Sequence, residues 1–150
     1  MRLRVKSPAK VNIFLRVLDK REDGYHNIQS IMQMVDLCDI LTFEKSRSGI
    51  ALASNSKDIP FDSDNIVFRA AELLKDKGMI SEGISIYIEK NIPVSAGLGG
   101  GSSNAAATLM TLNRFWGLGY DMNELSLIGG SLGSDVPFFL GGAASFVEGR

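Results

Sequence analysis

The segment best suited to chemistry is residues 93–104, PVSAGLGGGSSN, where four of five successive residues are glycine and two serines follow. An alternating apolar strand precedes the segment and an alanine-rich helix follows it, so backbone N–H groups and a helix N-terminus should meet there. Glycine lets a phosphate approach the backbone and tolerates positive φ, and Ser102 and Ser103 add hydroxyl donors. This placement favours a phosphate-binding loop over a flexible linker.

The loop follows neither of the two best-known phosphate-binding patterns. The pattern G-x-x-x-x-G-K-[ST] needs a lysine before the serine, and this loop has none. The dinucleotide pattern G-x-G-x-x-G, started at Gly97, finds Ser102 where its last glycine should be. The segment after the following helix is also expected to be helical, unlike the second strand of a βαβ unit.

Two charged residues outside the loop are candidates for catalysis. Lys10 begins a predicted strand, where it would hold a phosphate, keep a carboxylate ionised, or simply be solvated. Asp135, in GSDVPFF, would serve as a base for a hydroxyl nucleophile or cap a helix before Pro137. Spacing alone favours a solvated Lys10 and leaves both roles of Asp135 open.

Aromatic, imidazole and thiol groups are weaker candidates. Tyr25 and His26 follow the turn signal Asp23-Gly24 and could stack on a base, although an exposed turn pair is the commoner explanation. Cys38 is the sole cysteine, so no intrachain disulfide can form. A small core residue is favoured over a catalytic thiol at that position.

The elements that must position these groups are mainly extended in the first half of the chain. Residues 11–17 alternate, which predicts a half-buried strand with its apolar face formed by Val11, Ile13, Leu15 and Val17. The run from residue 25 fits strand or helix, and the turn before it favours a strand paired back as a hairpin. Short strands are predicted at 40–44 and 50–53, and a loop at 55–64.

A helix is predicted after that loop. Asp64 can cap it, Gly78 can end it, and its buried stripe would be Ile66, Val67, Ala70, Leu73 and Leu74. The next strand is predicted from the alternation of Ile84, Ile86 and Ile88.

The last third of the chain is expected to be mainly helical. One helix is predicted over 103–115, and a second would be capped by Asp121 with Glu124 and limited by Gly129-Gly130. GSDVPFF would form a turn into a short helix or extended piece, and 143–148 a strand. Strands and helices together indicate an α+β layer structure.

Composition sets the limits on class and location. The 150 residues suit one globular domain, with 45% hydrophobic and 22% charged residues. A net charge of −1 argues against nonspecific nucleic-acid binding. The charged N-terminus is unlike a signal peptide, and no apolar run is long enough to span a bilayer. A soluble, cytoplasmic protein without nucleic-acid or membrane partners is therefore expected.

Five segments, taken in order, resemble motifs of the GHMP kinase superfamily: SPAKVNIFL, DGYHN, DNIVFRAA, IPVSAGLGGGSSNAA and GSDVPFF. The glycine loop and GSDVPFF are similar to superfamily-wide motifs. SPAKVN combined with DGYH is narrower and resembles members that act on a cytidine diphosphate-linked small molecule. The resemblance implies a GHMP kinase N-terminal domain over residues 1–150, with the ribosomal protein S5 domain 2-like α+β fold, a mixed sheet packed against helices.

The resemblance also implies transfer of the ATP γ-phosphate to a substrate hydroxyl, a reaction that depends on positioning and charge neutralisation. Asp135 would accept or orient the hydroxyl proton, and Lys10 would keep Asp135 ionised and hold the substrate. The cytosine would lie at Tyr25 and His26, with Asn12 near the reacting end. The ATP contacts would be Asn65, Lys90, Pro93, Val94, Ser95, Ala96, Gly97, Leu98, Gly99, Gly100, Gly101, Ser102 and Ser103. Magnesium is expected with ATP, with Ser103 as the one candidate ligand named.

Family members resembling this chain are longer and have a second domain that closes the cleft. These 150 residues are therefore expected to hold the nucleotide loop and both catalytic candidates, yet to turn over weakly or not at all. Two other functions remain open. One is another GHMP small-molecule kinase, of the homoserine or mevalonate type, against which DGYH argues. The other is a non-catalytic nucleotide-binding module.

Overall fold

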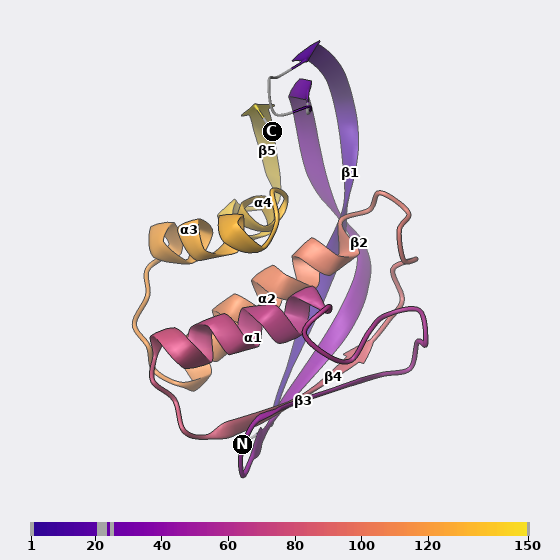
Figure 1. The fold of residues 1–150 in the computed structure, drawn as a ribbon. Coiled ribbons are helices and arrows are strands. Elements are labelled where there is room, and N and C mark those ends of the chain that lie inside the picture. The colour runs from indigo at the N-terminus through magenta and orange to yellow at the C-terminus, as the bar shows by residue number, and fades with distance from the viewer. Residues whose placement is uncertain (1, 21–23, 25, 150) are drawn as a thin grey trace.

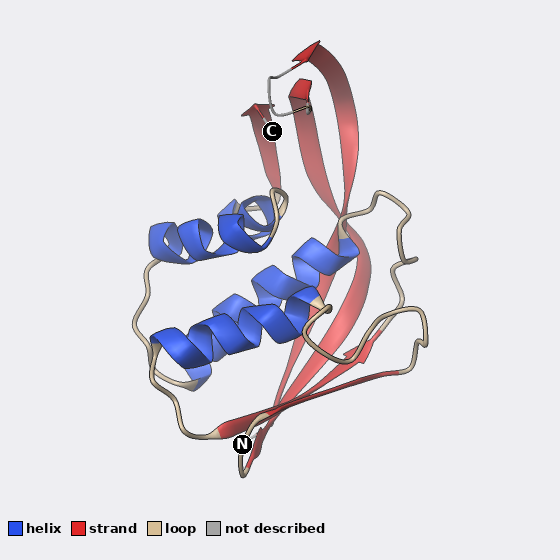
Figure 2. Cartoon of the chain, in the orientation of Figure 1, coloured by secondary structure: helices blue, strands red, loops and turns tan. Residues whose placement is uncertain are grey.

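The chain folds as one mixed sheet with helices gathered on one face, seen in a computed structural model that describes residues 2–20, 24 and 26–149 (Figures 1 and 2). The strands are β1 Arg2–Lys20, β2 His26–Ser46, β3 Ile50–Ser54, β4 Gly83–Glu89 and β5 Ala144–Gly149. The helices are α1 Ile66–Lys77, α2 Gly100–Phe115, α3 Met122–Leu132 and α4 Val136–Gly141. This architecture confirms the predicted α+β fold.

The sheet has the strand order β1-β2-β4-β3, and β5 pairs with β2 beyond the end of β4. β3 runs parallel to β4, whereas the other pairs are antiparallel. The hydrophobic core lies between the sheet and the helices. Successive strand side chains point to opposite faces, so Leu41 and Phe43 of β2 are fully buried while Glu44 is exposed. Ile84, Ile86 and Ile88 of β4 are buried as predicted.

The hairpin of β1 and β2 is confirmed, with Gly24 at φ 85° in its turn. The separate short strand predicted over 40–44 is wrong, because β2 is continuous from His26 to Ser46. Its register against β1 shifts between Pro8 and Ala9, which pair with Cys38 and Val35. This irregularity absorbs the extra β2 residues at Pro8, which has no N–H to donate. The run from residue 25 and the segment 40–44 can therefore belong to one strand, β2.

The burial predicted for residues 11–17 is also wrong, although they do form a strand. Val11 is 37% exposed, Ile13 66%, Leu15 52% and Val17 59%. Figure 2 shows why: the far ends of β1 and β2, together with β5, extend beyond the helices. The alternation therefore predicts the strand conformation correctly, but it does not show whether another element covers the apolar side chains.

The cap of α1 is Asn65, one residue later than the predicted Asp64. The side-chain oxygen of Asn65 accepts a hydrogen bond from the backbone N–H of Val67 at 2.9 Å. An N-cap side chain must reach the second or third helical N–H, which Asn65 does at this helix start. Gly78 lies at the C-terminal end of α1, as predicted.

The capping box of Asp121 and Glu124 is confirmed at the start of α3, but Gly129-Gly130 does not limit that helix. The helix continues past both glycines to Leu132, and Gly129 has a packing role instead. A Cβ at Gly129 would lie 2.8 Å from Cγ1 of Val136 in α4, so the missing side chain lets the two helices approach closely.

Two further helical boundaries bear on the site. α2 begins at Gly100, three residues before the predicted start, so the last glycines of the loop form its first turn. GSDVPFF leads into the short helix α4, and β5 follows it nearly as predicted. Within the described part of the chain, no helix is long and apolar enough to cross a membrane.

Candidate nucleotide site

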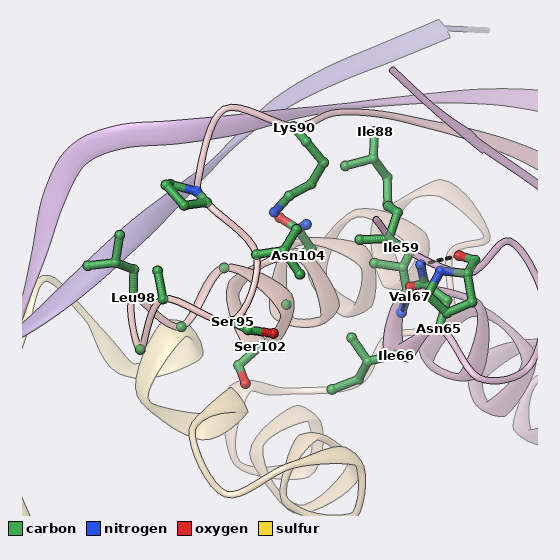
Figure 3. A pocket seen from close by; sticks show the side chains of 18 of the residues that line it. Ile59, Asn65, Ile66, Val67, Ile88, Lys90, Ser95, Leu98, Ser102 and Asn104 are labelled. Atoms are coloured by element: carbon green, nitrogen blue, oxygen red, sulfur yellow. Dashed lines mark hydrogen bonds between the residues drawn. The ribbon is translucent and has the colours of Figure 1, made fainter. Parts of the chain in front are cut away.

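The glycine loop forms one wall of a pocket with a volume of about 400 Å³, within the range of about 300–1,000 Å³ usual for small-molecule sites (Figure 3). Leu98, Ser95 and Ser102 lie on one side of the pocket, and Ile59, Asn65 and Val67 lie opposite. The far wall is largely apolar, whereas the loop offers backbone groups. Every predicted ATP contact except Ser103 lines this pocket.

The loop needs glycine at Gly97 and Gly99, which have φ values of 74° and 69°. Gly99 is the N-cap of α2, and no side chain of the described residues caps this end. The first N–H groups of α2 therefore remain available to a ligand, and the helix dipole favours a negative charge beside them. A pocket with such a wall can bind phosphate groups.

Lys10 is buried, so the solvated position that spacing alone favoured for this side chain is wrong. Its side chain is 7% exposed, and Nζ lies 3.7 Å from Oδ2 of Asp135 and 3.2 Å from Oδ1 of Asn12. Its backbone N–H donates to the carbonyl of Leu98 at 2.9 Å. Lys10 therefore joins the glycine loop to Asp135.

Asp135 occupies the N-cap position of α4 but makes no side-chain cap hydrogen bond with any described residue. Its side chain is 34% exposed, so a ligand can reach it. The 3.7 Å separation from Lys10 exceeds an ordinary charge-assisted hydrogen bond of about 2.7–2.9 Å. The carboxylate thus keeps capacity to accept a proton donor beside a fixed positive charge.

The predicted base-binding pair, Tyr25 and His26, follows Gly24 in the sequence. Tyr25 lies outside the described residues, and His26 is described only as the first residue of β2, paired with Lys20. Their contact with a cytosine stays a prediction. Asn12 is exposed on β1 beside Lys10.

Asn65 is largely engaged within the protein. Besides capping α1, its amide nitrogen donates to the carbonyl of Pro60 at 2.7 Å. The side chain is buried and holds the loop before α1 against the helix start. In this arrangement Asn65 shapes the apolar wall of the pocket.

Ser103 points away from the pocket. Its hydroxyl is buried 2.8 Å from the hydroxyl of Ser7, which also lies 2.7 Å from the side-chain oxygen of Asn104. This cluster fixes the first turns of α2 to β1, while Ser102 lines the pocket. Sequence reasoning did not identify Ser7, the serine of SPAKVN, as a residue that supports the site.

Asp39 is the other residue that the sequence analysis missed. It is fully buried on β2 and forms an ion pair with Lys90, whose side chain is 7% exposed. The available signal was the presence of two acidic residues, Asp36 and Asp39, inside the mainly apolar run VDLCDILTF. A buried charge needs a partner, and Lys90 provides it.

The described residues contain no group of three or more His, Cys, Asp or Glu side chains that could hold a metal ion. A magnesium ion bound with ATP would therefore take most of its ligands from the phosphates, as is usual for this ion.

Comparisons with known proteins bear on the family and the fold of the chain. The family model described as GHMP kinases N terminal domain matches residues 65–143. A protein of Prochlorococcus marinus subsp. pastoris named 4-diphosphocytidyl-2-C-methyl-D-erythritol kinase is 50% identical over 148 residues, covering 97% of this chain and 47% of that protein. A protein of the same name from Clostridioides difficile is 51% identical, covering 98% and 50%. The chain spans about half the length of the curated relatives it matches.

Solved structures show the same relation. A crystal structure of 4-(cytidine 5'-diphospho)-2C-methyl-D-erythritol kinase matches with a TM-score of 0.86 at 37% identity, covering 98% of this chain and 52% of that one. A homoserine kinase from Cytophaga hutchinsonii matches with a TM-score of 0.72 at 20% identity, covering 97% and 48%. The second match supports the fold alone.

Proposed function

Because this chain belongs to the GHMP kinases, we propose that it is the nucleotide-binding half of an ATP-dependent kinase acting on 4-diphosphocytidyl-2-C-methyl-D-erythritol. The phosphoryl acceptor would be the 2-hydroxyl, in the non-mevalonate route to isoprenoids. One observation carries the proposal: the glycine loop, Lys10 and Asp135 converge, since Lys10 bonds to Leu98 and lies 3.7 Å from Asp135. The names of the relatives that are about 50% identical support the choice of substrate.

In the proposed mechanism, the loop and the start of α2 bind the ATP phosphates through backbone N–H groups. The substrate hydroxyl lies against Asp135, which takes its proton as the oxygen attacks the γ-phosphorus. The bond from the γ-phosphorus to its bridging oxygen breaks, and ADP leaves with the electron pair. Lys10 keeps Asp135 ionised and offsets the negative charge that gathers beside it.

We propose Asn12, Tyr25 and His26 as the substrate contacts, as the motif resemblance implies. Magnesium would accompany ATP, with its phosphate oxygens as the main ligands, and would neutralise charge on the transferred group. Asn65 and Lys90 would border the nucleotide. The remaining half of the protein would supply the rest of the substrate site.

The test is ATP-dependent phosphorylation of the cytidylyl substrate by the full-length protein, with and without Asp135→Asn. Loss of a general base should lower kcat by about 10²–10⁴-fold and leave ATP binding unchanged. Asp76→Asn is the matched control, because Asp76 is an exposed aspartate on α1. A variant rate at Asp135 equal to that of the control would remove Asp135 from the mechanism. A panel containing homoserine and mevalonate decides the substrate class.

A further inference from the structure

Asp39 is a buried carboxylate that contacts the residues immediately before the glycine loop. It lies on β2 opposite Ser7 of β1 and is fully buried. Oδ1 accepts hydrogen bonds from the backbone N–H groups of Asn91 at 2.7 Å and Ile92 at 2.8 Å, and Oδ2 accepts one from Nζ of Lys90 at 2.5 Å. One side chain therefore holds three successive residues that join β4 to the loop.

Lys90 is held from a second direction as well. Its backbone N–H donates to the side-chain oxygen of Asn55 at 2.7 Å, so the main chain and the ammonium group are both fixed. Nζ lies 3.3 Å from the position that a Cβ on Gly100 would take, which places the ammonium at the first turn of α2. Lys90 also lines the pocket.

This position is electrostatically unusual, because the N-terminus of a helix disfavours a positive charge. Asp39 offsets that unfavourable interaction within the protein, and an anionic ligand at the start of α2 would offset it further. A buried ion pair also contributes little net stability compared with apolar residues of similar size. Stability alone therefore gives weak reason for a charged pair here, whereas binding an anion gives a strong one.

We infer that Asp39 is a positioning residue for ATP, an inference that rests on the proposed function. An ammonium group has three donors, and Asp39 accepts from one of them. The other two are directed to the nucleotide phosphates at the start of α2. Asp39 does not touch the nucleotide itself: it acts by holding the Lys90 ammonium, while its Oδ1 holds the main chain of Asn91 and Ile92, a role that an asparagine oxygen can also fill.

The test measures the Kd of ATP and the Kd of adenosine, which lacks phosphates, by calorimetry on the full chain. Competition between the two ligands shows that they share one site. Asp39→Asn keeps the shape of the side chain but removes its charge, and an amide oxygen that accepts from Asn91 and Ile92 leaves the NH2 group facing the Lys90 ammonium. We expect the Kd for ATP to rise about tenfold or more, the effect of losing one charge-assisted hydrogen bond, and the Kd for adenosine to stay unchanged. Asp36→Asn is the control, because Asp36 is exposed on the same strand and the charge change is identical.

A double-variant comparison separates positioning from a general loss of folding. The double variant Asp39→Asn with Lys90→Met should bind ATP no more weakly than Lys90→Met alone, because Asp39 assists ATP binding only through an ammonium that both variants lack. The double variant buries no unpaired charge, so it should fold even if Asp39→Asn alone does not. It then still shows whether Asp39 acts through Lys90. Thermal melting of each variant shows which ones are folded.

The outcomes distinguish this inference from the proposed function. Normal ATP binding by folded Asp39→Asn, or an equal weakening of ATP and adenosine binding, overturns the positioning role while the kinase proposal stands. Weaker ATP binding by the double variant than by Lys90→Met does the same. A wild-type chain that binds no ATP overturns the proposed function and this inference together.

Discussion

Gly99 tests how closely the glycine loop packs against the groups proposed for catalysis. An added Cβ in Gly99→Ala would lie 2.8 Å from Cζ of Phe139 and 3.0 Å from Cγ of Lys10. The Phe139 ring is 6% exposed and lies edge-on to Phe138 with centroids 5.0 Å apart, so it has little room to move. The substitution must therefore displace the loop, the ring or Lys10.

The magnitude has two separable parts. The backbone at Gly99 has φ 69°, and an alanine in that left-handed conformation costs about 1–2 kcal/mol. Overpacking against a buried ring costs about 1–3 kcal/mol more. We expect the free energy of unfolding to fall by about 2–5 kcal/mol in Gly99→Ala.

Gly97→Ala is the matched control, because Gly97 has φ 74° and no atom within 4 Å of the added Cβ. It should lose only the conformational part, about 1–2 kcal/mol. Denaturant unfolding of both variants, with unchanged m-values, measures the difference that is due to packing. Two variants within about 0.5 kcal/mol of each other would refute the packing argument, since that is the size of an ordinary surface effect.

Two further substitutions test the local structure around the site. Asn65→Ala should lower the free energy of unfolding by about 0.5–2 kcal/mol through loss of the helix cap, measured by thermal melting, whereas Asp64→Ala should have no such effect. Equal losses in both would mean that the cap is assigned to the wrong residue. Ser7→Ala should cost about 1–3 kcal/mol, because Ser103 and Asn104 are left buried without that partner. An unchanged melting temperature would show that their hydroxyl and amide groups find other partners.

The sequence predicts those parts of the fold whose cause is local. The Asp121 and Glu124 capping box and the alternation of Ile84, Ile86 and Ile88 depend on near neighbours, and both were confirmed. Errors arose where tertiary packing decides. Gly129 ends no helix because α4 packs against it, and the side chains of residues 11–17 are exposed because no helix extends that far.

The candidate site divides in the same way. The glycine loop was predictable because its chemistry is concentrated in twelve successive residues, 93–104. Motif resemblance suggested Lys10 and Asp135 as a pair, but no local pattern could show that they would lie 3.7 Å apart. Asp39 was hidden for a related reason. The role of Asp39 depends on Lys90, 51 residues later, and the sequence of β2 shows neither that Asp39 differs from its neighbour Asp36 nor which residue pairs with it.

Flexible glycines alone could not hold phosphates in one geometry, because each glycine adds conformational freedom that binding must remove. Here the loop is fixed at three points. Asp39 holds its entry at Asn91 and Ile92, the Lys10 N–H holds Leu98 in its middle, and Ser7 holds Ser103 at its exit. All three anchors come from β1 and β2. The hairpin that carries the proposed catalytic lysine therefore also sets the shape of the loop, so the distance between them is fixed by one rigid element.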